Sequence, residues 1–247
     1  MSDPLAPGGL APGGLSAVAA VVRWIATVLF VLAVPFFLIL GNVLNVAGDR
    51  DFYAAEFELY GVGQVTGLDS PQLMTVADAF IAYLREPTAR LDTVEVTLNG
   101  ARRPLFNDKE LRHMVDVKVI FELVKQARLV AGAILLILPL LGLWVAGSAI
   151  LPRIGMLLTV GGILTVVLLG LAGLLSLVDF SSAFVTFHEM AFSNDDWMLD
   201  PRTDYLIMLY PEGFWLDATL RIAMLSAIEA VIVGAVGLGI AYFGVRR

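Results

Sequence analysis

Four apolar stretches, each near or above the length that crosses a lipid bilayer, constrain the fold of this chain more than any other feature. They are residues 24–41, 129–150, 154–178 and 222–245. A helix needs about 20 mainly apolar residues to span the hydrocarbon core. The mean hydropathy of +0.83 is typical of an integral membrane protein. We therefore predict an all-α transmembrane bundle of four helices.

The positions of the basic residues predict how this bundle is oriented. Those next to short loops or chain ends are Arg23, Arg153, Arg246 and Arg247. With four spans they all lie on one side, which the positive-inside rule assigns to the cytoplasm. The other side receives residues 42–128 and 179–219, and the second of these has eight acidic residues and one basic residue. We predict cytoplasmic termini. The first stretch is long for a signal peptide, so we interpret it as an uncleaved anchor.

The spans divide the chain into segments with separate expected roles. These are a flexible Pro/Gly-rich cytoplasmic tail (1–17), the first span (18–48), an extracytoplasmic cap (49–106), a helix that carries His113 and runs into the second span (107–152), the third span (153–178), an extracytoplasmic segment that carries His188 (179–219), and the fourth span with the cytoplasmic C-terminus (220–247).

The cap is predicted to be a small α+β unit. Ser70-Pro71 is a good helix start, with Ser70 as N-cap, and apolar residues then recur at helical spacing as far as Leu84. Asn99-Gly100 between two short β-prone runs indicates a β-hairpin, because a type I′ turn needs positive φ at both positions. A unit this small has little core of its own and should lean on the membrane helices or on the bilayer surface. Asn107 can cap the next helix, with Glu110 three residues on as its capping-box partner.

Composition excludes several kinds of chemistry. The chain has no cysteine, which excludes disulfides, thiolate nucleophiles and thiolate metal sites. The formal net charge of -7 argues against nucleic acid as a partner. No Gly-x-Ser-x-Gly or Ser-x-x-Lys pattern supports a serine nucleophile, and phosphate-binding loops are absent.

The two histidines are the strongest candidates for chemistry. His113 and His188 lie in different polar segments that the charge pattern places on one side of the membrane. Histidine exchanges protons near neutral pH, so two imidazoles at one membrane face suit acid/base work on a bound lipid. Asp116 follows His113 at helical spacing and is close enough to contact it. Phe184 and Phe192 share a helix face with His188, and Asp195 would follow on that face if the helix continued.

Two stretches of the chain resemble a known family. The first is Phe-Asn-Asp-Lys-Glu-Leu-Arg-His-Met-Val-Asp-Val-Lys at residues 106–118. The second is Phe-His-Glu-Met-Ala-Phe-Ser-Asn-Asp-Asp-Trp-Met-Leu-Asp-Pro at residues 187–201, continued by Pro-Glu-Gly-Phe-Trp at residues 211–215. Both are similar to the lipoprotein intramolecular transacylases (Lit), which are four-span proteins of the bacterial cytoplasmic membrane.

The resemblance implies an acyl transfer. Members of the family act on lipoproteins whose N-terminal cysteine carries a diacylglyceryl group, and they move the sn-2 acyl chain to the α-amino group of that cysteine. The product is a lyso-form lipoprotein. The family's two functional histidines would fall on His113 and His188, on the extracytoplasmic side. The partners implied are a diacylated lipoprotein N-terminus and membrane lipid, with neither a cofactor nor a metal.

Other residues receive supporting roles in this interpretation. One histidine would act as base on the amine, and the other would protonate the leaving glyceryl oxygen. A route in which one histidine is a nucleophile stays open, as does which histidine is the base. Asp116 would orient His113, and Asn194 or loop N–H groups would stabilise the oxyanion. Asp195 and Trp197 are further supporting candidates. Phe184, Phe192 and Trp215 are expected to hold the substrate.

Two alternatives come from other classes of protein. One is a metal-dependent membrane hydrolase that uses both histidines with Asp195 or Asp196. The other is a non-catalytic transport or assembly protein, in which Glu229 inside the fourth stretch is the working charge.

Overall fold

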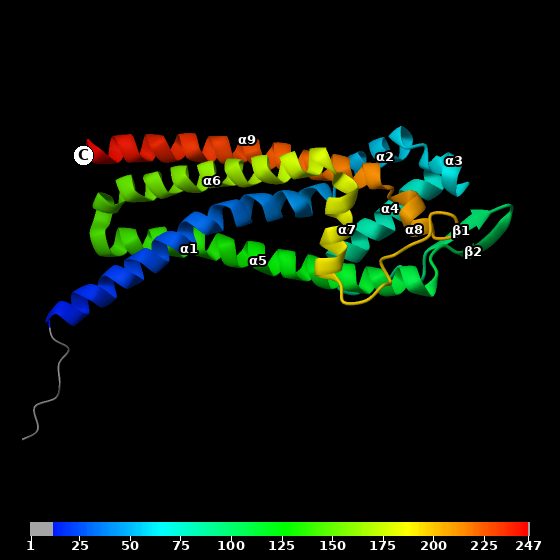
Figure 1. The fold of residues 1–247 in the computed structure, drawn as a ribbon, viewed down its shortest axis with the longest axis horizontal. Helices are drawn as coiled ribbons and strands as arrows, with labels where there is room; N and C mark the ends of the chain where they lie inside the picture. Colours follow the sequence, from blue (N-terminus) through cyan, green and yellow to red (C-terminus); the bar gives the residue numbers. More distant parts are fainter. Residues whose placement is uncertain (1–11, 247) are drawn as a thin grey trace, which may run out of the picture.

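The computed structural model describes residues 12–246 and is mostly helical (Figure 1). The elements in chain order are α1 (Pro12–Val46), α2 (Arg50–Leu59), α3 (Val62–Thr66), α4 (Ser70–Arg85), β1 (Glu95–Leu98), β2 (Ala101–Pro104), α5 (Asp108–Ala146), the 3-10 helix η1 (Gly147–Ile150), α6 (Leu151–Val178), α7 (Phe180–Ala191), α8 (Tyr205–Leu209) and α9 (Glu212–Val245).

Long apolar helices make up one end of the molecule. Within residues 12–246, three helical segments are long and apolar enough to cross a membrane: Ala17–Val46, Asp108–Leu174 and Glu212–Val245. The second is one continuous helical run in which α5 and α6 are joined by η1, where Gly147 has a φ of +60°. Figure 1 shows α6 running back from this turn beside α9, and α1 packs against both α5 and α6. The protein is therefore a helical membrane protein. Length and apolarity identify three candidate segments within the described residues, one fewer than the four spans predicted.

Glycine allows α6 and α9 to pack at close range. A Cβ atom built on Gly155 of α6 would lie 2.4 Å from the Gly237 carbonyl oxygen of α9, and one on Gly162 would lie 2.6 Å from the Ala230 carbonyl oxygen. Thr159 also donates a hydrogen bond from α6 to the Gly234 carbonyl at 3.1 Å. Since lipid tails are as apolar as leucine, such close backbone contact is what holds helices together in a bilayer.

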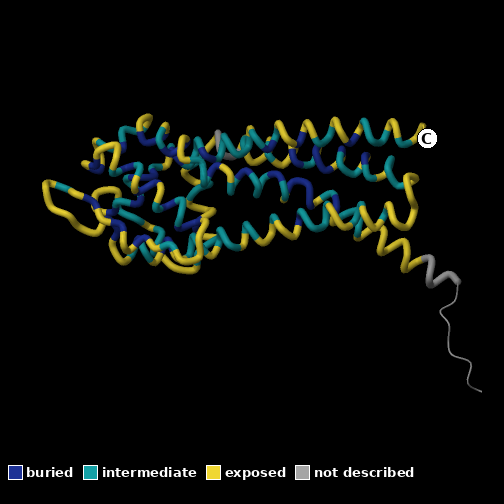
Figure 2. Tube along the Cα trace, turned by 180° about the vertical axis from the view of Figure 1, so that it is seen from behind, coloured by how far each residue is buried: buried dark blue, intermediate teal, exposed yellow. Residues whose placement is uncertain are grey.

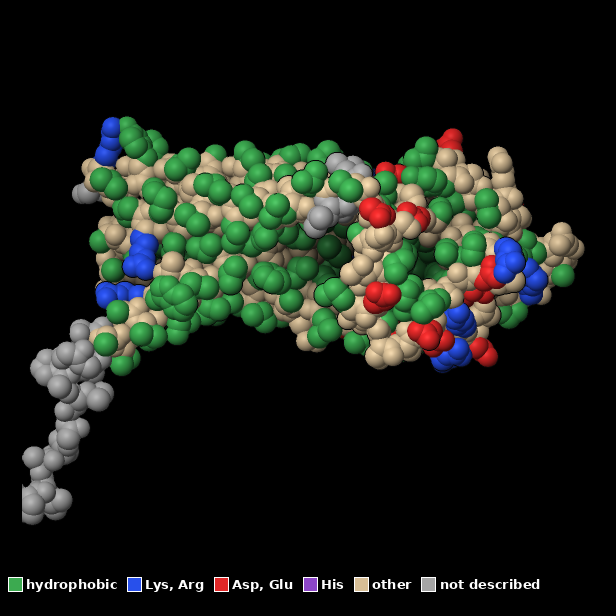
Figure 3. Space-filling view, in the orientation of Figure 1, with side chains coloured by type: hydrophobic (Ala, Val, Ile, Leu, Met, Phe, Trp, Pro, Cys, Tyr) green, Lys and Arg blue, Asp and Glu red, His purple; other side chains and the backbone are tan. Residues whose placement is uncertain are grey.

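The main hydrophobic core lies in the cap. Helices α2 and α4 supply Phe52, Tyr53 and Phe80. Their rings contact Tyr210, which precedes α9, or Phe214 in the first turn of α9. The expectation that the cap leans on the membrane helices is confirmed, because residues of α8 and α9 complete its core. Figure 2 shows buried residues concentrated in this part, whereas the long helices carry exposed residues along their outer faces. Figure 3 shows that those outer faces are mainly hydrophobic.

Of the local predictions for the cap, the hairpin is confirmed in full and the helix start only in part. The hairpin is confirmed: β1 pairs antiparallel with β2, with Leu98 opposite Ala101, and Asn99 has a φ of +52°. The helix is confirmed as α4, but the predicted N-cap is wrong by one position. Asp69 is the cap and accepts from the Gln72 N–H, so Ser70 lies inside the helix. A carboxylate one residue earlier caps as well as serine does.

The predicted flexible tail is also partly wrong. Residues 1–11 lie outside the described residues, but residues 12–17 form the start of α1. Proline fits the first turn of a helix, because its missing N–H would have no intrahelical partner there. A proline at position 12 is therefore compatible with the helix that follows it.

Candidate functional site

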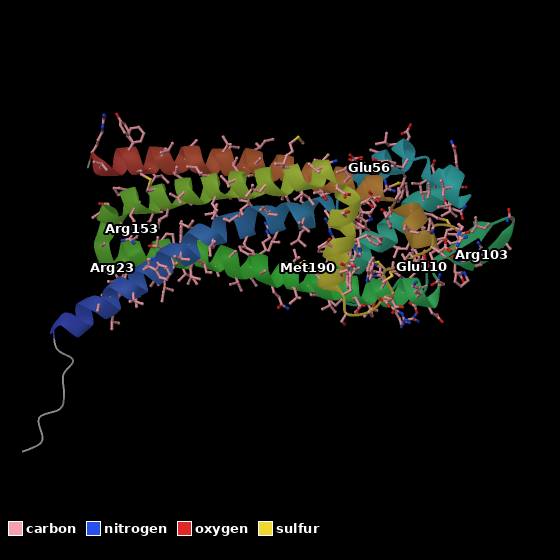
Figure 4. The ribbon with its side chains drawn as sticks, viewed as in Figure 1. Arg23, Glu56, Arg103, Glu110, Arg153 and Met190 are labelled. Atoms are coloured by element: carbon pink, nitrogen blue, oxygen red, sulfur yellow. The ribbon has the colours of Figure 1, made fainter. Side chains whose placement is uncertain are left out.

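The start of α5 is fixed rigidly, and this positions His113. Asn107 and Glu110 form the predicted capping box, in which the Asn107 side chain accepts from the Glu110 N–H and the Glu110 carboxylate accepts from the Asn107 N–H. The second Glu110 oxygen accepts from the Leu206 N–H at 2.6 Å. Glu110, labelled in Figure 4, is 1% exposed. It therefore joins α5 to α8 one turn before His113.

Helix α7 positions His188 from the other side. Asp179 caps this helix and accepts from the Ser182 N–H. The inward face carries Phe184 and His188, whose ring centroids are 4.2 Å apart, whereas Met190 on the outward face is 85% exposed (Figure 4). The spacing of these residues makes α7 amphipathic, so His188 is buried while the opposite face stays open.

The two imidazoles meet in one small cavity. Their ring centroids are 6.0 Å apart, and both side chains are buried. Both line a cavity of about 70 Å³. Its other walls are Phe80, Met114, Val117, Phe184, Trp197, Leu199, Leu206, Ile207, Tyr210 and Trp215. A mainly apolar pocket with a few polar groups is what a lipid-like group requires.

The hydrogen bonding of His188 fixes its tautomer. Its Nδ1 lies 2.7 Å from the Phe184 carbonyl oxygen. A carbonyl only accepts, so this nitrogen carries the hydrogen, and Nε2 is left with a lone pair that can take a proton. Burial lowers the pKa of His188 below its ordinary 6.5, and the bond to the Phe184 carbonyl raises it in part. The ring is therefore a neutral base at neutral pH.

The segment after α7 is held over the histidines by charged residues of α5. Arg112 forms a two-point salt bridge with Asp196, with both distances 2.9 Å. One turn later, Asp116 accepts a hydrogen bond of 2.8 Å from the Asn194 side chain. Lys109 donates to the Met198 carbonyl. These three α5 residues share one stripe of the helix, so the segment lies along α5 next to His113.

The structure places the predicted site residues in three groups. Phe184, Trp197 and Trp215 line the cavity with both histidines, and the Trp197 ring lies 5.2 Å from that of His188. Phe192 contacts both imidazoles, at 5.0 Å from His113 and 5.5 Å from His188, from outside the cavity lining. Asp116, Asn194 and Asp195 lie outside the lining as well.

The structure gives those polar residues partners of their own. His113 Nδ1 is buried and has no hydrogen-bond partner in the described part of the chain, while Asp116 accepts from Asn194. The Asn194 amide bonds Asp116 and also accepts from the Asp196 N–H. Helix α7 ends at Ala191, so the face shared by Phe184 and His188 does not continue to Asp195. The nitrogen and the oxygen of the Asn194 side-chain amide therefore each make a hydrogen bond that holds this segment.

One residue of the cavity lining is not identified by the sequence analysis. The Tyr210 hydroxyl is buried without a hydrogen-bond partner, and Tyr210 lines the cavity beside the histidines. Nothing in the spacing distinguishes Tyr210 from Tyr205, whose hydroxyl accepts from Arg103. A buried, unpaired hydroxyl is costly unless a ligand uses it.

Two of the charges assigned to the alternatives, Asp196 and Glu229, have structural partners. Among residues 12–246, no three histidine, aspartate or glutamate side chains form a group that could hold a metal ion. Asp196 is paired with Arg112, and Asp200 with Arg202. Glu229 accepts a hydrogen bond of 2.8 Å from Asn42 of α1, away from the histidine cavity.

Comparison with known proteins assigns the family. The family model described as "Lipoprotein intramolecular transacylase Lit" matches residues 28–215, which is more than half of the chain. The chain belongs to the lipoprotein intramolecular transacylase family. A protein of Aquifex aeolicus (strain VF5) described as uncharacterized is 33% identical over 135 residues, which are 55% of this chain and 56% of that protein. The chain thus matches about half the length of that relative.

Solved structures of a transacylase share the fold. The in meso structure of the membrane integral lipoprotein intramolecular transacylase Lit from Bacillus cereus has a TM-score of 0.73, with 20% identity, and covers 92% of this chain and 100% of that chain. A variant of that protein with one histidine replaced by arginine gives a TM-score of 0.72, with 19% identity over 94% of this chain and 97% of its own. At these identities the likeness concerns the fold.

Proposed function

We propose that this protein moves the sn-2 acyl chain of a lipoprotein's diacylglyceryl-cysteine to the α-amino group of the same cysteine, using His113 and His188. Membership of the transacylase family supports the reaction class. The observation that carries the site is the convergence of both imidazoles on one buried, mainly apolar cavity. Acyl transfer within one molecule needs little more than orientation and proton transfer, since amine and ester are already joined.

In this mechanism His188 is the base. Its Nε2 takes a proton from the amine as the nitrogen attacks the ester carbonyl carbon. An N-terminal amine has a pKa near 8, so about a tenth of it is already free near pH 7. Formation of the new N–C bond gives a tetrahedral intermediate. Its oxyanion needs a donor, and the unpaired Tyr210 hydroxyl supplies one.

His113 completes the reaction. The bond from the acyl carbon to the sn-2 oxygen breaks, and His113 gives that oxygen a proton while it takes up the proton held by His188. Both rings return to their neutral forms, and the products are an amide and a glyceryl alcohol. The unpaired Nδ1 of His113 is suited to this exchange, because no protein group competes for it. An acyl-imidazole route through either ring is the alternative chemistry.

The same proposal includes four membrane spans with the site outside the cytoplasm. Helices α5 and α6 are each long enough to cross the bilayer alone, and η1 turns the chain between them. Arg23 and Arg153 lie toward one end of the long helices, while Glu110, Met190 and Arg103 lie toward the other (Figure 4). The positive-inside rule assigns the first end to the cytoplasm.

Mass spectrometry of lipoprotein N-termini from bacteria that express the protein tests this function. The expected product has an unchanged number of acyl chains, with one moved from ester to amide. His113→Ala and His188→Ala should each abolish it, while Met190→Ala on the exposed face of α7 serves as the matched control. Loss of a fatty acid would instead indicate a lipase, and unmodified lipoprotein with the intact protein would refute the proposal.

A further inference from the structure

A second cavity lies between α1, α4, α5 and α9, on the membrane side of the histidine site. Its volume is about 540 Å³, against about 70 Å³ for the histidine cavity. On α4 its wall begins at Leu84, one turn after Phe80 of the first cavity, and on α5 at Phe121, one turn after Val117. None of the reaction steps above uses this cavity.

The lining of this second cavity combines positive charge with apolar surface. Arg85, Lys125 and Arg128 are its basic residues, and Glu229 is its one acidic residue among those described. Phe37, Leu38 and Leu44 of α1 are among its apolar residues. Arg128 is the last charged residue of α5 before the apolar stretch that begins at residue 129. The charge therefore lies at the depth of lipid headgroups, with apolar helix surface below it.

Most polar groups in this cavity already have structural partners. Lys125 donates to the Leu84 carbonyl and to Glu122, and Arg85 donates to the Gly48 carbonyl. Glu229 accepts from Asn42, which also donates to Ser226. These bonds join α4 to α5, and α1 to α9.

Arg128 is different. Its Nε is buried and has no hydrogen-bond partner, and its guanidinium lies 5.0 Å from the centre of the Phe37 ring. Gly41 provides the space, since a Cβ there would lie 3.0 Å from this Nε. A guanidinium at the wall of a cavity, with an unsatisfied N–H, is suited to an oxyanion that can accept from it in a charge-assisted bond.

We infer that this cavity binds the phosphodiester group of an anionic phospholipid, held by Arg128 with Lys125 and Arg85, while an acyl chain follows the apolar surface of α1. A phosphate satisfies the unpaired N–H and balances the excess of basic over acidic lining residues. The diacylglyceryl group of a lipoprotein has no phosphate, so this lipid is distinct from the proposed substrate. The inference does not depend on the proposed reaction.

Native mass spectrometry of the purified full chain in detergent tests the site, with short-chain phosphatidylglycerol and short-chain diacylglycerol as probes. We expect phosphatidylglycerol to bind about tenfold or more tightly than diacylglycerol, which lacks the phosphate. Arg128→Gln should weaken phosphatidylglycerol binding about tenfold. Arg153→Gln, which removes the same charge at the other end of the bundle, and His113→Ala should leave it unchanged. The comparison of the two lipids uses the unsubstituted protein, so its result holds even if a variant fails to fold.

Other outcomes would overturn the inference. Equal binding of the two lipids would show that no phosphate is recognised. Equal losses in Arg128→Gln and Arg153→Gln would show a nonspecific charge effect, and loss of binding in His113→Ala would assign the lipid to the histidine cavity. Displacement of phosphatidylglycerol by millimolar inorganic phosphate would indicate a site for the free anion instead of a lipid.

Discussion

At the scale of single residues, the site depends on which polar atoms are already bonded. His188 uses Nδ1 on the Phe184 carbonyl, which leaves Nε2 as a base. His113 Nδ1 and the Tyr210 hydroxyl have no partners in the described part of the chain. Buried polar groups are rarely left unpaired, so these two atoms are the places where a substrate would complete the hydrogen bonding.

Replacement of Tyr210 by phenylalanine separates catalysis from stability. The variant should lower kcat by about 100-fold if the hydroxyl stabilises the oxyanion. It should leave thermal stability equal or slightly higher, because the lost hydroxyl has no partner within the protein. Tyr205→Phe, which removes a hydroxyl bonded to Arg103 outside the cavity, is the matched control and should keep its rate. Unchanged kcat in Tyr210→Phe would exclude this role.

The proposed role of His188 as base predicts the pH dependence of the rate. A base must be neutral to act, and burial lowers the pKa of this histidine below 6.5. The acidic limb of kcat against pH should therefore lie below 6.5, and activity should persist at pH values where an exposed histidine would be charged. An acidic limb centred above 6.5 would be inconsistent with a buried imidazole as base. The rate is measured on purified protein with a synthetic lipopeptide.

At the scale of elements, α5 organises the site through two separate sets of contacts. Its first turn is joined to α8 by Glu110, and the stripe of Lys109, Arg112 and Asp116 holds the segment that follows α7. These contacts bring residues about 75 to 100 positions apart in the chain to one place. Helices α7 and α8 are short, so their positions depend on such tertiary contacts more than on helix propensity.

Glu110→Ala tests the joint between α5 and α8. The change leaves the N–H groups of Asn107 and Leu206 without their carboxylate partner, which should cost about 3 kcal/mol of unfolding free energy. Glu122→Ala on the same helix removes only a half-exposed ion pair with Lys125 and should cost less than about 1 kcal/mol. Denaturant titration in mixed micelles measures both. Equal effects of the two substitutions would show that Glu110 does not hold the elements together.

The elements differ in how far they could be predicted from the sequence. The Asn107–Glu110 capping box and the Asn99-Gly100 hairpin depend on local backbone geometry, and both are confirmed. The histidine pair was found through charge patterning and a family resemblance. Tyr210 and the second bond of Glu110 could not be found, because each depends on contacts between distant segments. Asp116 and Asn194 were assigned to chemistry individually, whereas the structure pairs them with each other.

At the scale of the whole molecule, the two ends of the bundle differ in charge and packing. One end carries Arg23 and Arg153, with Arg153 donating a hydrogen bond to Thr27 across α1 and α6. The other end has the cap, its aromatic core and the histidine cavity. Proposed function and proposed topology are therefore linked, since a lipoprotein's acylated N-terminus is available only outside the cytoplasm, where we propose that the cap lies.

The absence of cysteine makes the topology directly testable. Single cysteines are introduced as Asn99→Cys in the hairpin turn and Ser148→Cys in η1. A membrane-impermeant maleimide is then applied to cells whose layers outside the cytoplasmic membrane have been removed and whose cytoplasmic membrane is intact. We expect Asn99→Cys to be labelled and Ser148→Cys to be labelled only after the membrane is opened. The reverse pattern would invert the orientation, and labelling of both from outside would remove the second and third spans.

The most direct test of the central claim follows the acyl chain in a purified reaction. Two diacylglyceryl lipopeptides are mixed, one with an isotope-labelled sn-2 chain and the other with an isotope-labelled peptide. We predict lyso-form products in which the labelled chain becomes an amide on the unlabelled peptide alone, with no doubly labelled product, and no reaction in His113→Ala or His188→Ala. Doubly labelled amide, or full activity without either imidazole, would contradict an intramolecular transfer at this histidine pair.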